Sequence, residues 1–452
     1  MMKRRQFIQS STVLAATALL PGCASRSGAG NPDRLRTAHI GVGFQGQPDL
    51  DAIASHPAVD VVALCDVDAR TLSKVAAKYP NARTFADYRT MLREMGDEID
   101  AVVVATPDHT HAPASLLAME MNKPVYCQKP LTHHVSEARE MDRVARERKL
   151  VTQMGIQVHS FYDYRMATEL IRSGIIGKVN TVRAWSPKNW GYDGPPPTTA
   201  DPVPEGLNWD LWLGTAPQRA YVEGQYHPTN WRKFVDYGCG TLGDMGVHIF
   251  DTPYNALELD VPLTIVNECR PPNGYGFPEH NEVTYRFPAT DYTAADGLTW
   301  VWYDGVGAPD TAHADLELPD GESLPDQGAV FVGEKGRLLL PHFMIVPQLI
   351  VDGAYQDISA DIAAAGDRLE LGEPIRNYET ESPKHYHQFV DACLGKGETS
   401  APFRYAARLT EVILLGTIAG RFPGQTLHWN AGSARFDEEE ANQYLAGDYR
   451  AF

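Results

Sequence analysis

Paired cysteines are missing from this sequence. The 452 residues contain only six cysteines, at positions 23, 65, 127, 239, 269 and 393, and no two of them form a C-x-x-C pair. Cysteines scattered in this way indicate neither a zinc site nor a disulfide framework. Two closely spaced histidines, His109 and His111, also lack convergent further ligands in the sequence. We therefore expect no metal site.

An excess of positive charge is missing as well. The formal net charge is −18, from 58 acidic and 40 basic residues. A protein that binds nucleic acid normally carries a basic patch that neutralises phosphates, so this composition argues against a nucleic-acid partner. No internal repeat or low-complexity tract interrupts the chain. The composition is otherwise that of a soluble globular protein.

The third absence is an apolar run long enough to span a bilayer, which needs about 20 residues. The longest early run, residues 13–20, follows a basic start that contains Arg4 and Arg5. This arrangement predicts a signal peptide and linker over residues 1–30, of the twin-arginine type. We expect export to the periplasm, with Cys23 as a possible lipid anchor. The proline before Gly22 is unusual for a lipoprotein signal, so lipidation stays open.

From residue 37 the pattern alternates between strand and helix. Apolar, β-branched runs at 38–42, 59–65, 101–105 and 125–127 alternate with helical stretches at 47–54, 69–78, 111–121 and 135–149. Such alternation predicts an α/β Rossmann domain with a doubly wound parallel sheet over residues 35–155. Residues 156–452 show β-like runs at 179–185, 282–287 and 298–303, and helices at 164–173, 383–394 and 404–419. They predict an α+β domain with a large, mainly antiparallel sheet, for substrate binding and oligomerisation.

A glycine motif lies where the first strand meets the first helix. Gly41-Val42-Gly43-Phe44-Gln45-Gly46 has the spacing G-x-G-x-x-G. The three glycines permit a tight turn, close approach of a pyrophosphate and close helix packing, and the helix N-terminus favours the phosphates. Asp66 ends the second strand, 20 positions after Gly46, which is the spacing of a ribose-binding carboxylate. The motif therefore predicts a dinucleotide cofactor.

The same carboxylate bears on which dinucleotide binds. Asp66 would accept hydrogen bonds from ribose hydroxyls and repel a 2′-phosphate, and Asp68 adds further negative charge. We therefore expect NAD, while NADP stays open because the nearby Arg70 could accommodate the extra phosphate.

Three further motifs follow the glycine motif along the chain: A-T-P-D-H-T-H at 105–111, Q-K-P at 128–130 and G-T-L-G-D-M-G-V-H at 240–248. Taken in this order, the four motifs resemble those of the Gfo/Idh/MocA oxidoreductases over nearly the whole chain after the signal. The resemblance implies that Thr106, Pro107, His111, Gln128 and Lys129 lie beside the cofactor. It also implies that Lys129, Asp244 and His248 are the catalytic residues and that the Lys129–Pro130 bond is cis.

These residue types suit the oxidation of a sugar hydroxyl. Histidine can accept the hydroxyl proton near neutral pH, so we expect His248 to be the base. Lys129 would stabilise alkoxide character on the reacting oxygen. Asp244 precedes His248 by four residues, a spacing that shares one face of a helix, so we expect it to orient the imidazole. The family usually has glutamate before the lysine, whereas this chain has Gln128, which supplies no charge there.

Polar residues between aromatic ones predict the substrate surface of the second domain. Aromatic faces cover the apolar side of a sugar ring, and polar side chains bind its hydroxyls. The candidates for contact with a carbohydrate are Lys188, Asn189, Tyr226, His227, Asn230 and Arg232.

Export and a nicotinamide cofactor together carry a further expectation. The twin-arginine pathway exports folded proteins and free NAD is scarce outside the cytoplasm, so the cofactor is expected to be tightly bound and recycled in the same site. That favours an oxidoreductase that oxidises one sugar and reduces another. Two alternatives stay open: an NAD-dependent glycosidase with no net redox change, and a catalytically silent sugar-binding protein. A homo-oligomer is expected from the resemblance.

Overall fold

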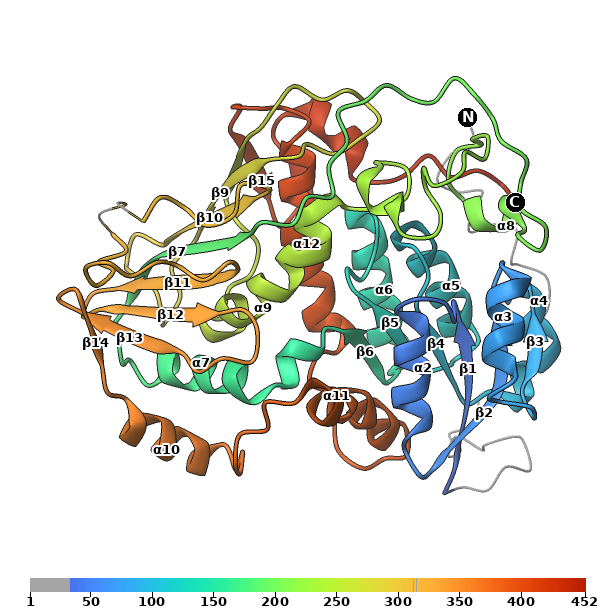
Figure 1. Ribbon diagram of the computed structural model, residues 1–452, viewed down its shortest axis with the longest axis horizontal. Coiled ribbons are helices and arrows are strands. Elements are labelled where there is room, and N and C mark those ends of the chain that lie inside the picture. Colours follow the sequence, from blue (N-terminus) through green and yellow to red (C-terminus); the bar gives the residue numbers. More distant parts are fainter. Residues whose placement is uncertain (1–32, 312, 314) are drawn as a thin grey trace. The chain divides into compact units, whose positions relative to one another are not determined.

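The computed structural model describes residues 33–311, 313 and 315–452 (Figure 1). The expected signal peptide and Cys23 lie outside these residues. Within them, no helix combines the length and the apolar character that crossing a membrane requires.

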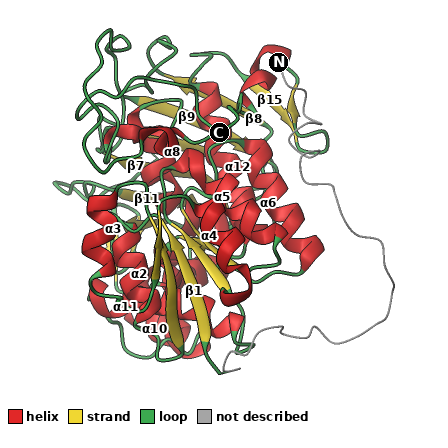
Figure 2. Ribbon diagram, turned by 90° about the vertical axis from the view of Figure 1, so that its right-hand side faces the viewer, coloured by secondary structure: helices red, strands yellow, loops and turns green. Residues whose placement is uncertain are grey.

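The first sheet has six strands in the order β3-β2-β1-β4-β5-β6, and every neighbouring pair is parallel. Figure 2 shows these strands, β1 among them, between two layers of helices. The strand order reverses between β1 and β4: β2 and β3 follow β1 on one side, and β5 and β6 follow β4 on the other. Such folds bind ligands at this point, at the carboxyl ends of the strands. This confirms the predicted doubly wound parallel sheet. The strands are β1 (Leu35–Ile40), β2 (Val59–Cys65), β3 (Arg83–Phe85), β4 (Ala101–Val104), β5 (Val125–Gln128) and β6 (Thr152–Gly155).

Five helices connect these strands: α2 (Gly46–Ala54), α3 (Ala69–Ala76), α4 (Tyr88–Met95), α5 (Asp108–Glu120) and α6 (Val135–Arg148). Aspartates start two of them, because the Asp68 and Asp87 side chains accept hydrogen bonds from backbone N–H groups of the first turns of α3 and α4. The sequence pattern missed β3, α4 and β6. Strands of three or four residues are too short to show a period.

The second sheet has ten strands in the order β14-β13-β12-β11-β7-β10-β9-β8-β15-β16, antiparallel except for β7 beside β10. It confirms the expected large, mainly antiparallel sheet. The strands are β7 (Val179–Ser186), β8 (Thr264–Glu268), β9 (Asn281–Phe287), β10 (Leu298–Asp304), β11 (Gly328–Gly333), β12 (Arg337–Pro341), β13 (Gln348–Val351), β14 (Ala354–Gln356), β15 (Leu427–Asn430) and β16 (Arg435–Phe436). The longer helices of this part are α7 (Tyr162–Arg172), α8 (Trp209–Leu213), α9 (Val247–Ala256), α10 (Ser359–Arg368), α11 (Tyr378–Cys393) and α12 (Phe403–Ala419).

Helix α11 belongs to the core of the first sheet although it lies more than two hundred residues later in the chain. Tyr386, Phe389 and Val390 pack with Leu35 and Tyr126, and the rings of Tyr126 and Tyr386 stack at 5.1 Å. Residues 35–155 therefore do not close the core of the nucleotide domain by themselves.

One face of the large sheet is covered by the chain itself. Trp185, Val301 and Val330 point to this face, and Leu316 from the loop after β10 is fully buried against them. Self-covering of this kind leaves less open sheet surface for a dimer contact than an uncovered sheet would.

Candidate active site

A cavity of about 1320 Å³ opens at the carboxyl ends of β1, β2, β4 and β5. Its wall at one end is the glycine turn with Asp66, and at the other end Lys129, Asp244 and His248. Thr106, Pro107, His111 and Gln128 line it between these ends. The structure thus brings the predicted catalytic residues and all the predicted cofactor residues except Gly46 around one space, to which both domains contribute.

The glycine turn is built so that two of its positions admit no side chain. Gly41 has φ +80°, and a Cβ atom there would lie 2.6 Å from the carbonyl oxygen of Ala105. At Gly46 a Cβ atom would lie 2.2 Å from the Gly41 carbonyl oxygen. Helix α2 begins at this turn, so the positive end of its dipole lies at the end of the cavity that Gly43, Phe44 and Gln45 line, where it would favour a phosphate. Phe44, with φ 45° and 66 % exposed, projects from the same turn. The arrangement fits a dinucleotide pyrophosphate.

Asp66 and Asp68 have different roles at the end of β2. The Asp66 carboxylate accepts hydrogen bonds from the N–H groups of Val42 (3.0 Å) and Asp68 (2.9 Å), which fixes it at the cavity wall, and burial raises its pKa. Asp68 caps α3 and forms a two-point ion pair with Arg70, whose Nε and Nη2 lie 2.9 and 2.7 Å from its oxygens. The charge of Arg70 is therefore already countered within the protein.

A long excursion of the second domain, the segment after β7 that contains residues 206–227, covers this end of the cavity. Gly206 accepts a hydrogen bond from the N–H of Ala69 at 2.8 Å, and the N–H of Asn208 donates to Val67 at 2.9 Å. His227 from the same excursion has its Nε2 3.6 Å from Asp68. Expected at the substrate, His227 thus lies at the ribose end of the cofactor cleft instead. The excursion places it there because its backbone is hydrogen-bonded to the β2–α3 turn.

Lys129 and Asp244 form the centre of the other end. The Lys129 ammonium donates to the Asp244 carboxylate and to the Asp244 backbone oxygen, both at 2.9 Å. Asp244 also accepts from Trp190 Nε1 at 2.6 Å and Arg232 Nε at 3.1 Å. Burial opposes its ionisation, but the charges of Lys129 and Arg232 prevail and hold the pKa of Asp244 well below its usual range. The Lys129–Pro130 bond is cis, as the resemblance implies.

The expected pairing of Asp244 with His248 is not present. Asp244 lies in a π-helical turn, η4 (Leu242–Gly246), and the regular helix α9 begins only at Val247, so the four-residue spacing does not align the two side chains. Among the described residues no hydrogen bond joins them, and the Nδ1 atom of His248 is buried without a partner. Burial, and then the nearby Lys129 charge, lower the pKa of His248 well below its usual value. Its imidazole is therefore neutral at pH 7.

Gln128 is held from below by a buried carboxylate. Its Nε2 donates to Asp49 at 2.8 Å, and its Oε1 accepts from the Lys129 N–H at 3.1 Å. Asp49 also accepts hydrogen bonds from Tyr386 at 2.6 Å and Gln45 at 2.9 Å, and burial raises its pKa to about 6. The family usually has a carboxylate at position 128. In this chain the carboxylate is that of Asp49, which lies behind Gln128, away from the cavity.

His111 ties the loops around the site together. Its two ring nitrogens lie 2.9 Å from the Pro130 carbonyl oxygen and 2.8 Å from that of Thr106. Burial lowers its pKa to about 4. His111 therefore connects the segment after β4 to the segment that carries Lys129.

The predicted substrate residues divide into two groups. Lys188 and Arg232 line the cavity beside Asp244. Tyr226 does not, because it is buried in an aromatic cluster and hydrogen-bonded to Tyr275 at 2.6 Å. Asn189 and Asn230 also lie outside the lining residues, and each amide side chain bonds to nearby backbone: the N–H of Gly191 and the carbonyl oxygen of Gly224.

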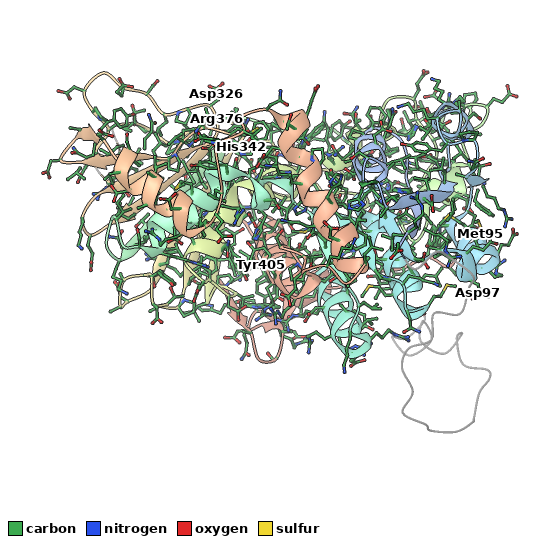
Figure 3. All side chains as sticks on the ribbon, turned by 90° about the horizontal axis from the view of Figure 1, so that it is seen from below. Met95, Asp97, Asp326, His342, Arg376 and Tyr405 are labelled. Atoms are coloured by element: carbon green, nitrogen blue, oxygen red, sulfur yellow. The ribbon has the colours of Figure 1, made fainter. Side chains whose placement is uncertain are left out.

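The sequence analysis missed two residues of the site: His342, which lines the cavity, and Asp49, which is buried behind the lining residue Gln128. His342 (Figure 3), from the turn after β12, lies opposite His248, with ring centroids 6.4 Å apart, and its Nδ1 is hydrogen-bonded to the Tyr164 hydroxyl. Asp49 lies within α2. Neither occurs in a motif; the only available signal for Asp49 was a carboxylate on the otherwise apolar inner face of that helix. Among the described residues, no group of three or more acidic, histidine or cysteine side chains could hold a metal ion.

A glycine turn of this form, a carboxylate at the end of the second strand and a lysine beside the cavity define an NAD-binding oxidoreductase fold. Two family models match the chain: the NAD-binding Rossmann fold of an oxidoreductase family over residues 35–156, and its C-terminal alpha/beta domain over residues 163–327. The chain belongs to this Gfo/Idh/MocA family.

Individual relatives are more distant. An inositol 2-dehydrogenase of Rubrobacter xylanophilus is 32% identical over 159 residues, 34% of this chain and 45% of that protein. A glycosyl hydrolase family 109 protein of Stenotrophomonas maltophilia is 34% identical over 138 residues, 28% and 29% of the two chains. These matches span less than half of either relative. A solved aldose-aldose oxidoreductase from Caulobacter crescentus is 16% identical, covers 87% of this chain and 99% of its own, and superposes with a TM-score of 0.58.

Proposed function

We propose that this protein oxidises a hydroxyl of a sugar or sugar derivative, using an NAD that stays bound and is recycled in the same site. The observation that carries the proposal is that the glycine turn, Lys129 and His248 line one and the same cavity. Similarity to inositol 2-dehydrogenases and to an aldose-aldose oxidoreductase supports the substrate class.

The glycine turn and Asp66 would hold NAD in the cleft, and the bound cofactor would supply the hydride acceptor for the carbon that carries the reacting hydroxyl. His248 takes the hydroxyl proton at the same time, which its neutral imidazole allows. Lys129, held in place by Asp244, donates a hydrogen bond to the oxygen as negative charge develops there. The alcohol thus loses a hydride and a proton and becomes a carbonyl. Reduction of a second sugar runs the same steps in reverse and regenerates the oxidised cofactor.

Retention of the cofactor is supported by the excursion that covers the ribose end. Helix α8 in this excursion is joined to the C-terminus, where Arg450 Nη1 pairs with Asp210 at 2.7 Å. The final residue, Phe452, packs under Arg89 of the first domain, 4.0 Å from the guanidinium to the ring centroid. Figure 1 shows the C-terminus beside α8. Cofactor exchange would require these contacts to open. Asp66, with Arg70 already paired to Asp68, favours NAD over NADP.

The test uses protein purified without added nucleotide. Denaturation followed by mass spectrometry should release about one NAD(H) per chain. Incubation with a mixture of aldoses should then give oxidised and reduced products in equal amounts, without added cofactor. An empty protein that also fails to bind added NAD(H) or NADP(H) would refute the proposal and favour a sugar-binding protein without catalysis.

An NAD-dependent glycosidase is the second candidate. Similarity of 138 residues of the chain to the glycosyl hydrolase family 109 protein favours it. Such an enzyme would cleave a glycoside with no net redox change, so product analysis separates the two candidates.

We also propose export by the twin-arginine pathway to the periplasm, with Cys23 as a possible lipid anchor, because the first 30 residues have that pattern. Fractionation of cells, with Arg4 and Arg5 replaced by lysine as the control, tests export. We also propose that the protein forms a homo-oligomer. Its molar mass in solution, measured by light scattering, tests this proposal.

A further inference from the structure

The reactive end of the cavity carries more positive charge than its own carboxylate can balance. Three cations, Lys129, Lys188 and Arg232, surround the one carboxylate of Asp244. In the described part of the chain none of the three has a second acidic partner within 4 Å. One anion balances one cation, so this cluster has a surplus of about two positive charges. The surplus stands out in a chain whose formal net charge is −18.

The neighbouring acids do not remove this surplus. Asp108 is buried at the same end, and burial raises its pKa to about 7, so it is largely neutral below that pH. Asp66, Asp68 and Glu223 line the opposite, ribose end of the cavity. The histidines at the reactive end are neutral at pH 7, because burial lowers the pKa of His342 to about 4 and lowers that of His248 as well.

Lys188 and Arg232 also have donors to spare. The Lys188 ammonium lies 3.9 Å from Asp244, beyond hydrogen-bond distance, and its side chain is 50 % exposed. In Arg232, Nε donates to Asp244 and Nη1 to the Thr229 carbonyl oxygen, while Nη2 has no protein acceptor among the described residues. The guanidinium packs over the Trp231 ring at 4.3 Å, which fixes its plane. A planar fork with a free N–H group beside a free ammonium suits a carboxylate.

We infer that the substrate is a carbohydrate that carries a carboxylate, such as a uronic acid, and that Lys188 and Arg232 bind this group. The inference rests on the proposed function, because it places the carboxylate next to Lys129, where the reacting hydroxyl is expected. A neutral sugar would leave two buried or half-buried cations without a counter-charge, whereas a carboxylate balances one of them and engages the free donors. The positive cluster would also attract an anionic substrate into the cavity.

Matched pairs of sugars test the inference on the full-length protein with its bound cofactor. D-glucuronate is compared with D-glucose, and D-galacturonate with D-galactose, by isothermal titration calorimetry and by analysis of oxidised products. We expect the uronate of at least one pair to bind at least tenfold more tightly than its neutral partner. That preference should shrink as the salt concentration rises, because ionic attraction is screened.

Variants locate the preference. Lys188→Met, which removes a half-exposed ammonium, should reduce the uronate preference, the ratio of uronate affinity to neutral-sugar affinity, at least threefold. Lys188→Arg should retain the preference, and Lys335→Met, which removes an exposed lysine of the β11–β12 turn, should not change it. Arg232→Met provides a second variant at the proposed carboxylate site.

The outcomes separate the two proposals. Neutral sugars that bind and react as well as the uronates, with no effect of Lys188→Met on selectivity, would overturn the carboxylate inference while the oxidoreductase proposal stands. Charge-dependent binding of a uronate without any oxidised product, in protein that releases no nucleotide, would support carboxylate binding and overturn the oxidoreductase proposal.

Discussion

Replacing Gln128 by glutamate would put a second carboxylate beside Asp49 in a fully buried position. The Gln128 amide lies 2.8 Å from the Asp49 carboxylate, so the new oxygen would take the place of an N–H donor. Two negative charges about 3 Å apart repel each other by roughly 6 kcal/mol at an effective dielectric constant of about 20. Between pH 6 and pH 8, the free energy needed to keep a proton on one of the two carboxyl groups is smaller than this repulsion. The pair is therefore expected to share one proton.

The pH dependence follows from that proton. In the wild-type protein burial raises the pKa of Asp49 to about 6, so above pH 6 the native protein and the unfolded chain are both ionised at this residue. In Gln128→Glu the native pair keeps a proton that the unfolded chain, with carboxyl pKa values near 4, has lost. Because the native state binds more protons, stability falls as the pH rises, by about 1.4 kcal/mol per unit. Relative to wild type, the loss therefore grows by about 2.7 kcal/mol between pH 6 and pH 8.

Urea denaturation at pH 6, 7 and 8 measures this difference. Asp49→Asn/Gln128→Glu is the matched control, because it restores one carboxylate and one amide with their positions exchanged. Its stability relative to the single variant Asp49→Asn should not fall between pH 6 and pH 8. A Gln128→Glu protein as stable as wild type at pH 8, or a double variant with the same pH-dependent loss, would refute the proposed pairing of Asp49 with Gln128.

Four further predictions concern the cofactor and the reactive end. Lys129→Met should lower the turnover of sugar by a factor of about 100 to 1000 while NAD remains bound, as product analysis and nucleotide release would show. Asp66→Asn should weaken NAD binding by about tenfold to a hundredfold in titrations of the apoprotein, because it removes a charged acceptor for the ribose. Gly46→Ala should destabilise the fold by about 1–3 kcal/mol in thermal or urea unfolding, because its Cβ atom would lie 2.2 Å from backbone. Arg450→Ala should speed the release of bound NAD(H), measured by dialysis against excess labelled NAD, with Arg435→Ala as an exposed control.

The nucleotide domain was predictable because its signals are local. Strands such as 101–104 are entirely apolar and, apart from Ala101, β-branched, and the glycine motif lies directly between a strand and a helix. The residues at which helices begin were less predictable. Helix α5 begins at Asp108, whereas the sequence predicted His111, and α11 begins at Tyr378, whereas the sequence predicted Pro383. A proline within the first turns of a helix looks like a boundary in sequence, but it is compatible with the helix continuing before it.

The sequence predicted which residues belong to the site better than it predicted how these residues contact one another. The spacing of Asp244 and His248 predicts a shared helix face, but the π-helical turn changes their relation and three cationic or N–H donors take the carboxylate instead. Tyr226 looked like a sugar-binding aromatic because nothing in the sequence shows which aromatic rings pack against each other. Long-range pairs of this kind depend on tertiary packing, which no periodicity reveals.

Asp49 and Gln128 show how a departure from a family pattern can make physical sense only in three dimensions. Seen alone, Gln128 removes a charge beside the proposed catalytic lysine. In the structure, Asp49 lies directly beneath it and takes three hydrogen bonds, one of them from Gln128. A glutamate at 128 would compete with Asp49 for the single negative charge that this buried position tolerates. The two residues are therefore one feature, and any relative with glutamate at this place is expected to have an uncharged residue where this chain has Asp49.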